Sequence, residues 1–308
     1  MIVVVRYICI VALAALLPAA LQGQQLPVSG LPFAHLFDAH PAVAGQDTLL
    51  HATMWNHSQW TRTADAPRTT SLSLTAPLKN GPLGWGIRTT SDVVGPTRVS
   101  SVHGALSYHV RWNENVRVSF GAALGALQYT LDGSRVQLEQ SGDPVLSGEV
   151  QSAVLPDASA SIWVEGGRFF GGASLQQLLG STLRLSEPSS GQSHLEDHFT
   201  AILGCHLERG AWTATPVVQF THLRPASPDI TGQIDIAYQD RLWGTLGYRN
   251  TGGITLGLGT RVHQRVIARY AYEVNTGPLA SAIGGGHTVV LSFTTSHHAS
   301  IQKSRTAR

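Results

Sequence analysis

The residues of this chain that could do chemistry are its histidines, its serines and its cysteines. The 14 histidines include two close pairs, His194 with His198 and His297 with His298, and imidazole is a common metal ligand. Neither pair stands with the carboxylate or cysteine set that a structural zinc site requires. We therefore predict no metal site and no cofactor.

Covalent catalysis would require a nucleophile in a recognisable setting. Cys205 lies in Ile202-Leu203-Gly204-Cys205-His206-Leu207, which is typical of an ordinary strand. A Ser/His/Asp or Asn cluster at the rim of a barrel would make an enzyme, but no serine stands in a known nucleophile motif. Gly284-Gly285-Gly286 is better explained as a flexible turn than as a phosphate loop, which needs a following helix. We expect no catalytic residue.

The N-terminus has the anatomy of a secretory signal. Arg6 precedes an apolar stretch from Tyr7 to about Leu17, and small residues lead to Gly23. A transmembrane anchor is the alternative, but a helical span needs about 20 apolar residues, and this stretch is shorter before Pro18 interrupts it. We predict that residues 1–23 are a signal peptide removed before Gln24. Cys9 leaves with it, so the mature chain keeps one cysteine and cannot form an internal disulfide.

Composition indicates that much of the surface meets lipid. Charged residues make up 13% of the chain, whereas soluble domains carry roughly 25%. No later stretch is apolar enough for a membrane helix, and a closed β-barrel is the other structure that can cross a bilayer. The net charge of +2 and the lack of a basic stripe argue against nucleic acid as a partner.

Residue alternation supports a barrel directly. From Val116 to Ala126 the even positions are apolar and the odd ones are mostly polar or small, which is the period of a strand. The same pattern recurs from Ser71 to Thr75, from Ile254 to Gly259 and from Arg269 to Val274. A soluble β-sandwich alternates too, but its strands need not reach the roughly 9 to 11 residues that cross a bilayer.

About 14 strands are predicted between turn signals, an even number as in bacterial barrels. They span residues 47–57, 68–77, 83–91, 99–111, 115–128, 156–165, 168–177, 198–208, 211–222, 231–239, 242–249, 253–261, 265–274 and 286–294.

Long and short connections alternate along this series. The long ones cover residues 58–67, 92–98, 129–155, 178–197, 223–230 and 275–285, and tight turns such as Gly166-Gly167 lie between them. Because outer-membrane barrels have short periplasmic turns and long outer loops, the chain is expected to begin and end on the periplasmic side. The fold class is therefore an all-β, antiparallel transmembrane barrel with a short N-terminal periplasmic segment.

This organisation divides the chain into four parts. After the signal peptide, residues 24–46 are expected to form an N-terminal periplasmic plug segment and residues 47–294 the outer-membrane barrel. Residues 295–308 form a polar, basic C-terminal tail, which is expected to be disordered, with binding to the cell wall as the alternative.

A series of motifs resembles the PorP/SprF family of type IX secretion system outer-membrane proteins. The motifs are Pro41-Ala42-Val43-Ala44-Gly45, Trp60, Ala66-Pro67, Ser91-Asp92-Val93-Val94-Gly95-Pro96-Thr97 and Leu242-Trp243-Gly244-Thr245-Leu246-Gly247-Tyr248-Arg249. The positions singled out as family-motif or structural residues are Pro41, Ala42, Gly45, Trp60, Pro67, Gly95, Pro96, Trp243, Tyr248 and Arg249. His40 stands where the family usually has Asn.

The resemblance implies a non-catalytic barrel in the outer membrane of a bacterium of the Bacteroidota type. Its implied partners are type IX components, periplasmic peptidoglycan-linked proteins, outer-membrane lipid and secreted cargo with a C-terminal sorting domain, often an adhesin. The implied task is secretion or surface attachment of that cargo. The alternative function is a passive pore for small solutes or fatty acids, which any barrel permits.

Overall fold

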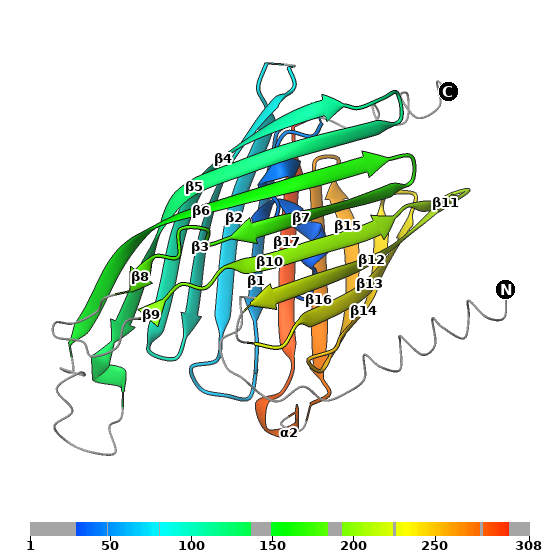
Figure 1. Cartoon of the computed structure of the whole chain (residues 1–308). Coiled ribbons are helices and arrows are strands. Elements are labelled where there is room, and N and C mark those ends of the chain that lie inside the picture. The colour runs from blue at the N-terminus through cyan, green and yellow to red at the C-terminus, as the bar shows by residue number, and fades with distance from the viewer. Residues whose placement is uncertain are drawn as a thin grey trace, which may run out of the picture.

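Fourteen antiparallel strands form one closed barrel in the computed structural model of this chain (Figure 1). The structure describes residues 29–47, 49–79, 81–136, 149–183, 193–223, 226–277 and 280–295. Around the ring, successive barrel strands pair with each other in chain order, with β7 (Phe169–Gln176) paired to β10 (His198–Cys205) and β10 to β12 (Trp212–Leu223). The pairing of β1 (His51–Ser58) with β17 (Gly286–Thr294) closes the ring. The predicted barrel class is confirmed.

The strands follow the predicted spans. They are β1 (His51–Ser58), β2 (Arg68–Pro77), β3 (Leu83–Val94), β4 (Thr97–Arg111), β5 (Val116–Asp132), β6 (Val150–Gly166), β7 (Phe169–Gln176), β10 (His198–Cys205), β11 (Leu207–Arg209), β12 (Trp212–Leu223), β13 (Asp229–Tyr238), β14 (Leu242–Arg249), β15 (Gly253–His263), β16 (Val266–Asn275) and β17 (Gly286–Thr294). Two-residue strands β8 (Thr182–Leu183) and β9 (Ser193–His194) pair beside the barrel, and α2 (Ala280–Ile283) and η4 (Gly133–Arg135) lie in connections.

Several predicted boundaries differ from the structure. Strand β5 continues to Asp132, and strand β6 begins already at Val150. Cross-strand pairs such as Tyr129 with Ala153 extend the two strands into the loop expected over residues 129–155. Strands β3 and β4 likewise extend until only Gly95 and Pro96 connect them, so the loop predicted over residues 92–98 is wrong. The strand predicted over residues 198–208 is interrupted at His206, which separates β10 from β11.

The barrel is apolar outside and polar inside. Leu72, Leu124 and Leu258 are 46%, 70% and 75% exposed on the outer face, whereas Ser71 and Ser119, one and five positions before the first two, are almost fully buried. In water such a continuous apolar exterior would mark an interaction surface, and in a transmembrane barrel it is the face that meets lipid. The strand alternation therefore assigns lumen and exterior correctly.

The two rims differ in their connections. Turns between β2 and β3, β4 and β5, β6 and β7, β11 and β12, β13 and β14, and β15 and β16 are tight and define the short-turn end. The other connections include the longest ones and define the long-loop end. No helix among the described residues is long and apolar enough to cross a membrane.

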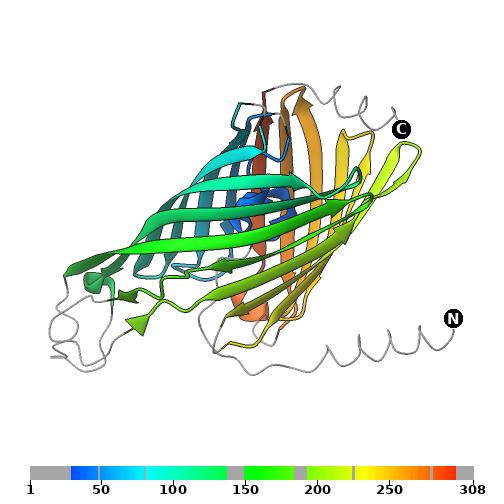
Figure 2. The same cartoon turned by 45° about the horizontal axis from the view of Figure 1, so that its top comes forward.

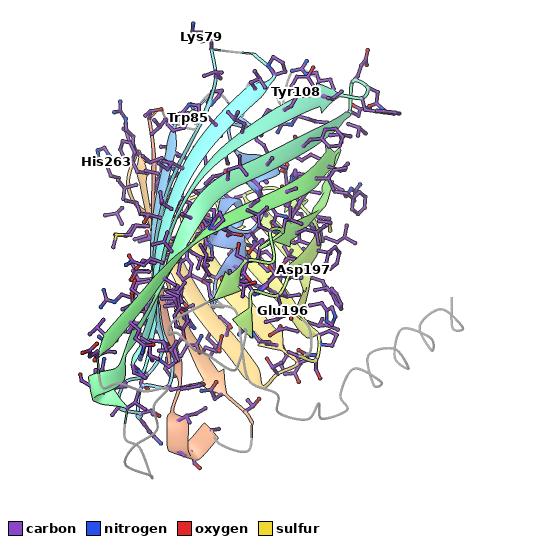
Figure 3. All side chains as sticks on the ribbon, turned by 60° about the vertical axis from the view of Figure 1, so that its left-hand side comes forward. Lys79, Trp85, Tyr108, Glu196, Asp197 and His263 are labelled. Atoms are coloured by element: carbon purple, nitrogen blue, oxygen red, sulfur yellow. The ribbon has the colours of Figure 1, made fainter. Side chains whose placement is uncertain are left out.

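Except for Trp60 in the loop after β1, the tryptophans divide between the lumen wall and the short-turn end of the barrel. Trp112 and Trp212 are 77% and 54% exposed, and the Trp212 ring lies 4.7 Å from that of Tyr238. Lys79 and Tyr108 lie near the same end (Figure 3). Aromatic rings at a rim match the interfacial belt of membrane barrels. Trp163, in contrast, is 2% exposed inside the barrel.

Candidate functional site

The lumen holds the N-terminal residues 29–47, which we call the plug segment. It forms three short 3-10 turns, η1 (Pro32–Ala34), η2 (Leu36–Asp38) and η3 (Pro41–Val43), which lie inside the ring of strands (Figure 2). Two apolar clusters anchor it: Leu31 packs with Trp55 and Val290, and Ala42 packs with Trp163. The small core of this protein thus lies between the plug segment and the lumen wall.

The plug segment runs along the lumen from one rim towards the other. At the long-loop end, Gly30 N donates to Thr288 Oγ1 at 3.1 Å, close to the start of β17. At the short-turn end, Ser107 Oγ donates to the Ala44 carbonyl at 2.6 Å, and an Arg117 guanidinium nitrogen donates to the Gln46 carbonyl. The segment therefore occupies the length of the lumen instead of only its mouth.

Glycines in the wall leave room for the plug backbone. A Cβ on Gly121 would lie 2.2 Å from Ala42 N, and one on Gly84 would lie 2.1 Å from the Ala44 carbonyl oxygen. Gly45 has a φ of +64°, which favours glycine. The Pro41-Ala42-Val43-Ala44-Gly45 motif is thus the part of the plug segment that contacts the wall most closely.

Polar contacts hold the same stretch at several strands. Ala42 N donates to Ser161 Oγ at 2.7 Å, and Trp55 Nε1 donates to Asp38 Oδ2 at 2.5 Å. Gln176 Nε2 donates to the Ala39 carbonyl at 3.2 Å. Since buried polar groups are costly without partners, these matched contacts fix the register of the plug segment against the wall.

Two plug histidines are buried against aromatic rings. His40 is 1% exposed and its ring centroid lies 5.4 Å from that of Trp163, while His35 stacks on Trp55 at 4.5 Å. Burial lowers the pKa of His40 to about 4 and also lowers the pKa of His35. The plug segment therefore packs both imidazoles in the neutral form at neutral pH.

One serine–histidine contact in the lumen has only part of the geometry of a catalytic triad. His109 Nδ1 lies 2.8 Å from Ser119 Oγ, but its Nε2 lies 2.9 Å from the Ala44 carbonyl, where a triad would have a carboxylate. Ser119 is 0% exposed. This geometry fastens the plug segment to the wall and leaves the serine closed to a substrate.

The motif on β14 contributes to the lumen and to the outer face. Arg249 points inward, where its Nη2 lies 3.4 Å from Glu273 Oε2 and 3.5 Å from the Ser29 carbonyl. Trp243 is also inward, with the Arg269 guanidinium 5.0 Å from its ring. Tyr248 is 46% exposed on the outer face. Arg249 thus joins the beginning of the plug segment to the long-loop rim.

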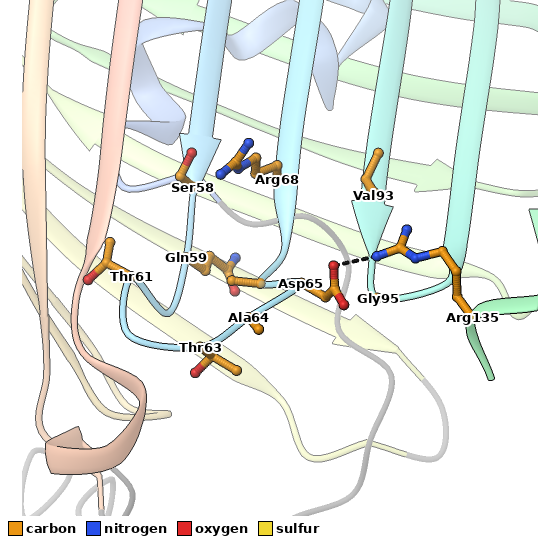
Figure 4. A pocket seen from close by; sticks show the side chains of 11 residues that line it. Ser58, Gln59, Thr61, Thr63, Ala64, Asp65, Arg68, Val93, Gly95 and Arg135 are labelled. Carbon is orange, nitrogen blue, oxygen red and sulfur yellow. Dashed lines mark hydrogen bonds and ion pairs between the residues drawn. The ribbon is translucent and has the colours of Figure 1, made fainter. Parts of the chain in front are cut away.

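The remaining motif residues gather at the long-loop rim. Gln59 N, next to Trp60, donates to the Pro67 carbonyl at 2.9 Å; Gly95 N donates to the Asp65 carbonyl at 3.0 Å; and Asp132 N donates to the Pro96 carbonyl at 3.0 Å. Beside these bonds lies an open pocket of about 430 Å³, whose lining includes Ser58, Thr63, Asp65, Arg68, Val93 and Arg135 (Figure 4). The motifs therefore serve two places, the plug contacts and this loop cluster.

Sequence analysis missed the wall glycines. Gly84, Gly86 and Gly121 face the lumen on β3 and β5, and a Cβ on Gly86 would lie 2.4 Å from the Phe37 ring. Their signal was present, because all three occupy lumen-facing positions of strands that otherwise alternate regularly. Among the described residues, no group of three or more His, Cys, Asp or Glu side chains could hold a metal ion.

Comparison with known families decides the assignment. A model described as type IX secretion system membrane protein PorP/SprF matches residues 21–293. The chain belongs to the PorP/SprF family. No curated protein matches it significantly. As a PorP/SprF protein with an outer-membrane type of barrel, it is a membrane protein of the type IX secretion system and lies in the outer membrane.

One solved structure supports the fold of this PorP/SprF barrel, and two others are similar to it in part. A Pseudomonas aeruginosa FadL homologue is 10% identical, with 89% of this chain and 99% of that chain covered and a TM-score of 0.50. The CymD monoaromatic hydrocarbon channel is 10% identical, with 90% and 95% covered and a TM-score of 0.48. Acinetobacter baumannii Omp33 is 8% identical, with 80% and 98% covered and a TM-score of 0.45.

Proposed function

We propose that this protein is a non-catalytic part of the type IX machinery that assists secretion or surface attachment of proteins with C-terminal sorting domains, such as adhesins. The observation that carries the proposal is the plug segment, which is bound near both rims through Gly30 and Ala44. A barrel occupied in this way offers partners its rims and loops. Membership of the PorP/SprF family supports a place in the secretion system.

The two rims suit different partners. Residues 1–23 act as the signal peptide, and the short-turn rim faces the periplasm, as in other outer-membrane barrels. There the end of the plug segment is available to type IX components and peptidoglycan-linked proteins. The basic tail of residues 295–308 lies outside the described residues after Thr295. Cargo contacts the long-loop rim through the connections 133–149 and 177–197. Parts of both connections, residues 137–148 and 184–192, lie outside the described residues.

Gene deletion followed by a comparison of secreted and surface proteins tests this proposal. Proteins with C-terminal sorting domains are expected to fall in the medium or at the surface, and the wild-type gene should restore them. A variant lacking residues 137–148 should assemble in the membrane but lose cargo. Unchanged secretion and retention in the deletion strain would exclude the role.

Planar-bilayer recording separates this function from a passive pore for small solutes or fatty acids. The intact protein is expected to show no steady conductance, because the plug segment occupies the lumen. Deletion of residues 29–46 should open an aqueous path through the polar interior. Steady conductance by the intact protein, together with an unchanged secretome in the deletion strain, would favour the pore.

A further inference from the structure

Two arginines point out of the barrel wall near the long-loop rim. Arg68 on β2 lies opposite Val93 on β3, which in turn lies opposite Arg98 on β4. Side chains alternate along a strand, so Arg68 shares the outer face with Leu72, and Arg98 shares it with Val102. Both apolar residues are about half exposed, at 46% and 49%. The arginines therefore face the surroundings of the barrel and not its lumen.

The position of the two arginines along the strands matches the edge of the apolar band. Arg68 lies four residues from Leu72, and Arg98 lies four residues from Val102, in each case towards the long-loop end. At about 3.4 Å per residue this is roughly 13 Å along the strand. Threonine and serine occupy the outward positions between them, Thr70 and Ser100. This gradient from apolar to hydroxyl to cation follows the change from hydrocarbon to headgroup.

The guanidinium groups of this pair are free within the described part of the chain. Neither the Arg68 nor the Arg98 guanidinium group makes a hydrogen bond or ion pair with another residue that the structure describes, whereas Arg135 is paired with Asp65 (Figure 4). Arg68 also lines the rim pocket beside the hydroxyls of Ser58 and Thr63. The charges of Arg135 and Asp65 cancel each other, so Arg68 gives this pocket a net positive charge.

We propose that Arg68 and Arg98, with the adjoining pocket, bind the phosphorylated headgroup of a lipid in the outer leaflet. Guanidinium groups bind phosphate oxygens in a bidentate manner, and the pocket hydroxyls supply further donors to sugar or phosphate oxygens. The partner is a lipid because both side chains leave the wall on the membrane side, directly beyond Leu72 and Val102. This inference is independent of the role in cargo secretion.

Lipid binding to the purified full-length protein in detergent tests the assignment. The probes are a diphosphorylated acylated glucosamine disaccharide, its dephosphorylated form and inorganic phosphate alone, measured by native mass spectrometry and titration. Replacement of both arginines (Arg68→Gln with Arg98→Gln) is expected to weaken binding of the phosphorylated lipid roughly thirtyfold. The matched control is Arg241→Gln with Arg265→Gln, two exposed arginines in short turns at the opposite rim, and it should bind as the wild type does.

Several outcomes would overturn the proposal. Equal binding by wild type and the Arg68/Arg98 variant, or equal loss in the Arg241/Arg265 control, would remove these arginines as the site. Equal binding of the dephosphorylated lipid would exclude phosphate recognition. Saturable binding of inorganic phosphate with the same affinity would assign the site to a soluble anion. Heat-modifiable migration on gels checks that each variant is a folded barrel, and the exposed positions of the substituted side chains favour folding.

Discussion

At the scale of single residues, His40 shows how the lumen constrains ionisation. The residue precedes Pro41 at the start of η3, and its ring lies against Trp163. Neither ring nitrogen has a hydrogen-bond partner among the described residues. Removing an imidazolium from water without a partner is costly, so burial lowers the pKa of His40 to about 4. The packed state of the plug segment is therefore stable with a neutral His40 ring and is destabilised when that ring is protonated.

Acidification is expected to loosen the plug segment through this residue. A released His40 has an ordinary pKa near 6.5, so the packed state binds fewer protons than the released state between pH 6.5 and 4. The stability of the packed state that depends on neutral His40 is fully present above pH 6.5, and it falls by about 3 kcal/mol as the pH approaches 4. Limited proteolysis of the purified protein across this range measures release of the segment.

The variant His40→Asn, which removes the titratable ring, should make release less dependent on pH. His35 contributes a remaining dependence in the same direction, because burial lowers its pKa as well. His263→Asn, at the exposed end of β15 near the short-turn rim, is the matched control and should behave as the wild type. Identical pH profiles for His40→Asn and the wild type would contradict this account.

At the scale of elements, the plug segment and strands β3 and β5 fit together through missing side chains. Many lumen-facing wall positions carry Ser, Thr or His, and the chain has glycine at positions 84, 86 and 121 where the plug backbone or Phe37 comes closest. The wall and the plug segment are therefore complementary in shape. Phe37 over Gly86 and Ala42 over Gly121 define the register between them.

Filling one of these spaces is expected to release the plug segment without damaging the barrel. In Gly121→Ala the new methyl group would lie 2.2 Å from Ala42 N, a backbone atom that cannot turn away. Overpacking of this kind costs about 1–3 kcal/mol, which raises the released fraction about 5- to 150-fold. Protease sensitivity of residues 29–47 and conductance in planar bilayers measure the change.

Gly104→Ala is the matched control for this change, since a Cβ at that outward position of β4 meets nothing within 4 Å. Its proteolysis and conductance should equal those of the wild type. If both variants behave alike, the close approach at Gly121 does not hold the plug segment. Normal heat-modifiable migration of each variant shows that the barrel itself is intact.

At the scale of the whole molecule, the sequence predicts the wall better than the contents of the lumen. Alternation is a local signal, so strands β2, β14 and β17 have the predicted bounds. The ends of β3, β5 and β6 depend on pairing with a neighbour, and local patterns underestimate them. The path of residues 29–47 depends on contacts to strands more than 100 residues away, such as Ser161 with Ala42, which periodicity does not encode.

The orientation of the barrel gives the last prediction. The long loops are expected to face the cell exterior and the tight turns the periplasm. In a Cys205→Ala background, which removes the single cysteine downstream of the signal, Thr63→Cys places an exposed thiol in the loop after β1. Gln264→Cys places one in the exposed turn between β15 and β16.

A membrane-impermeant maleimide applied to intact cells should label the first variant strongly and the second only after the outer membrane is permeabilised. Both should react equally in purified protein, which controls for thiol reactivity. Labelling of the Gln264 variant alone in intact cells would invert the barrel, and it would place Arg68 and Arg98 at the inner leaflet.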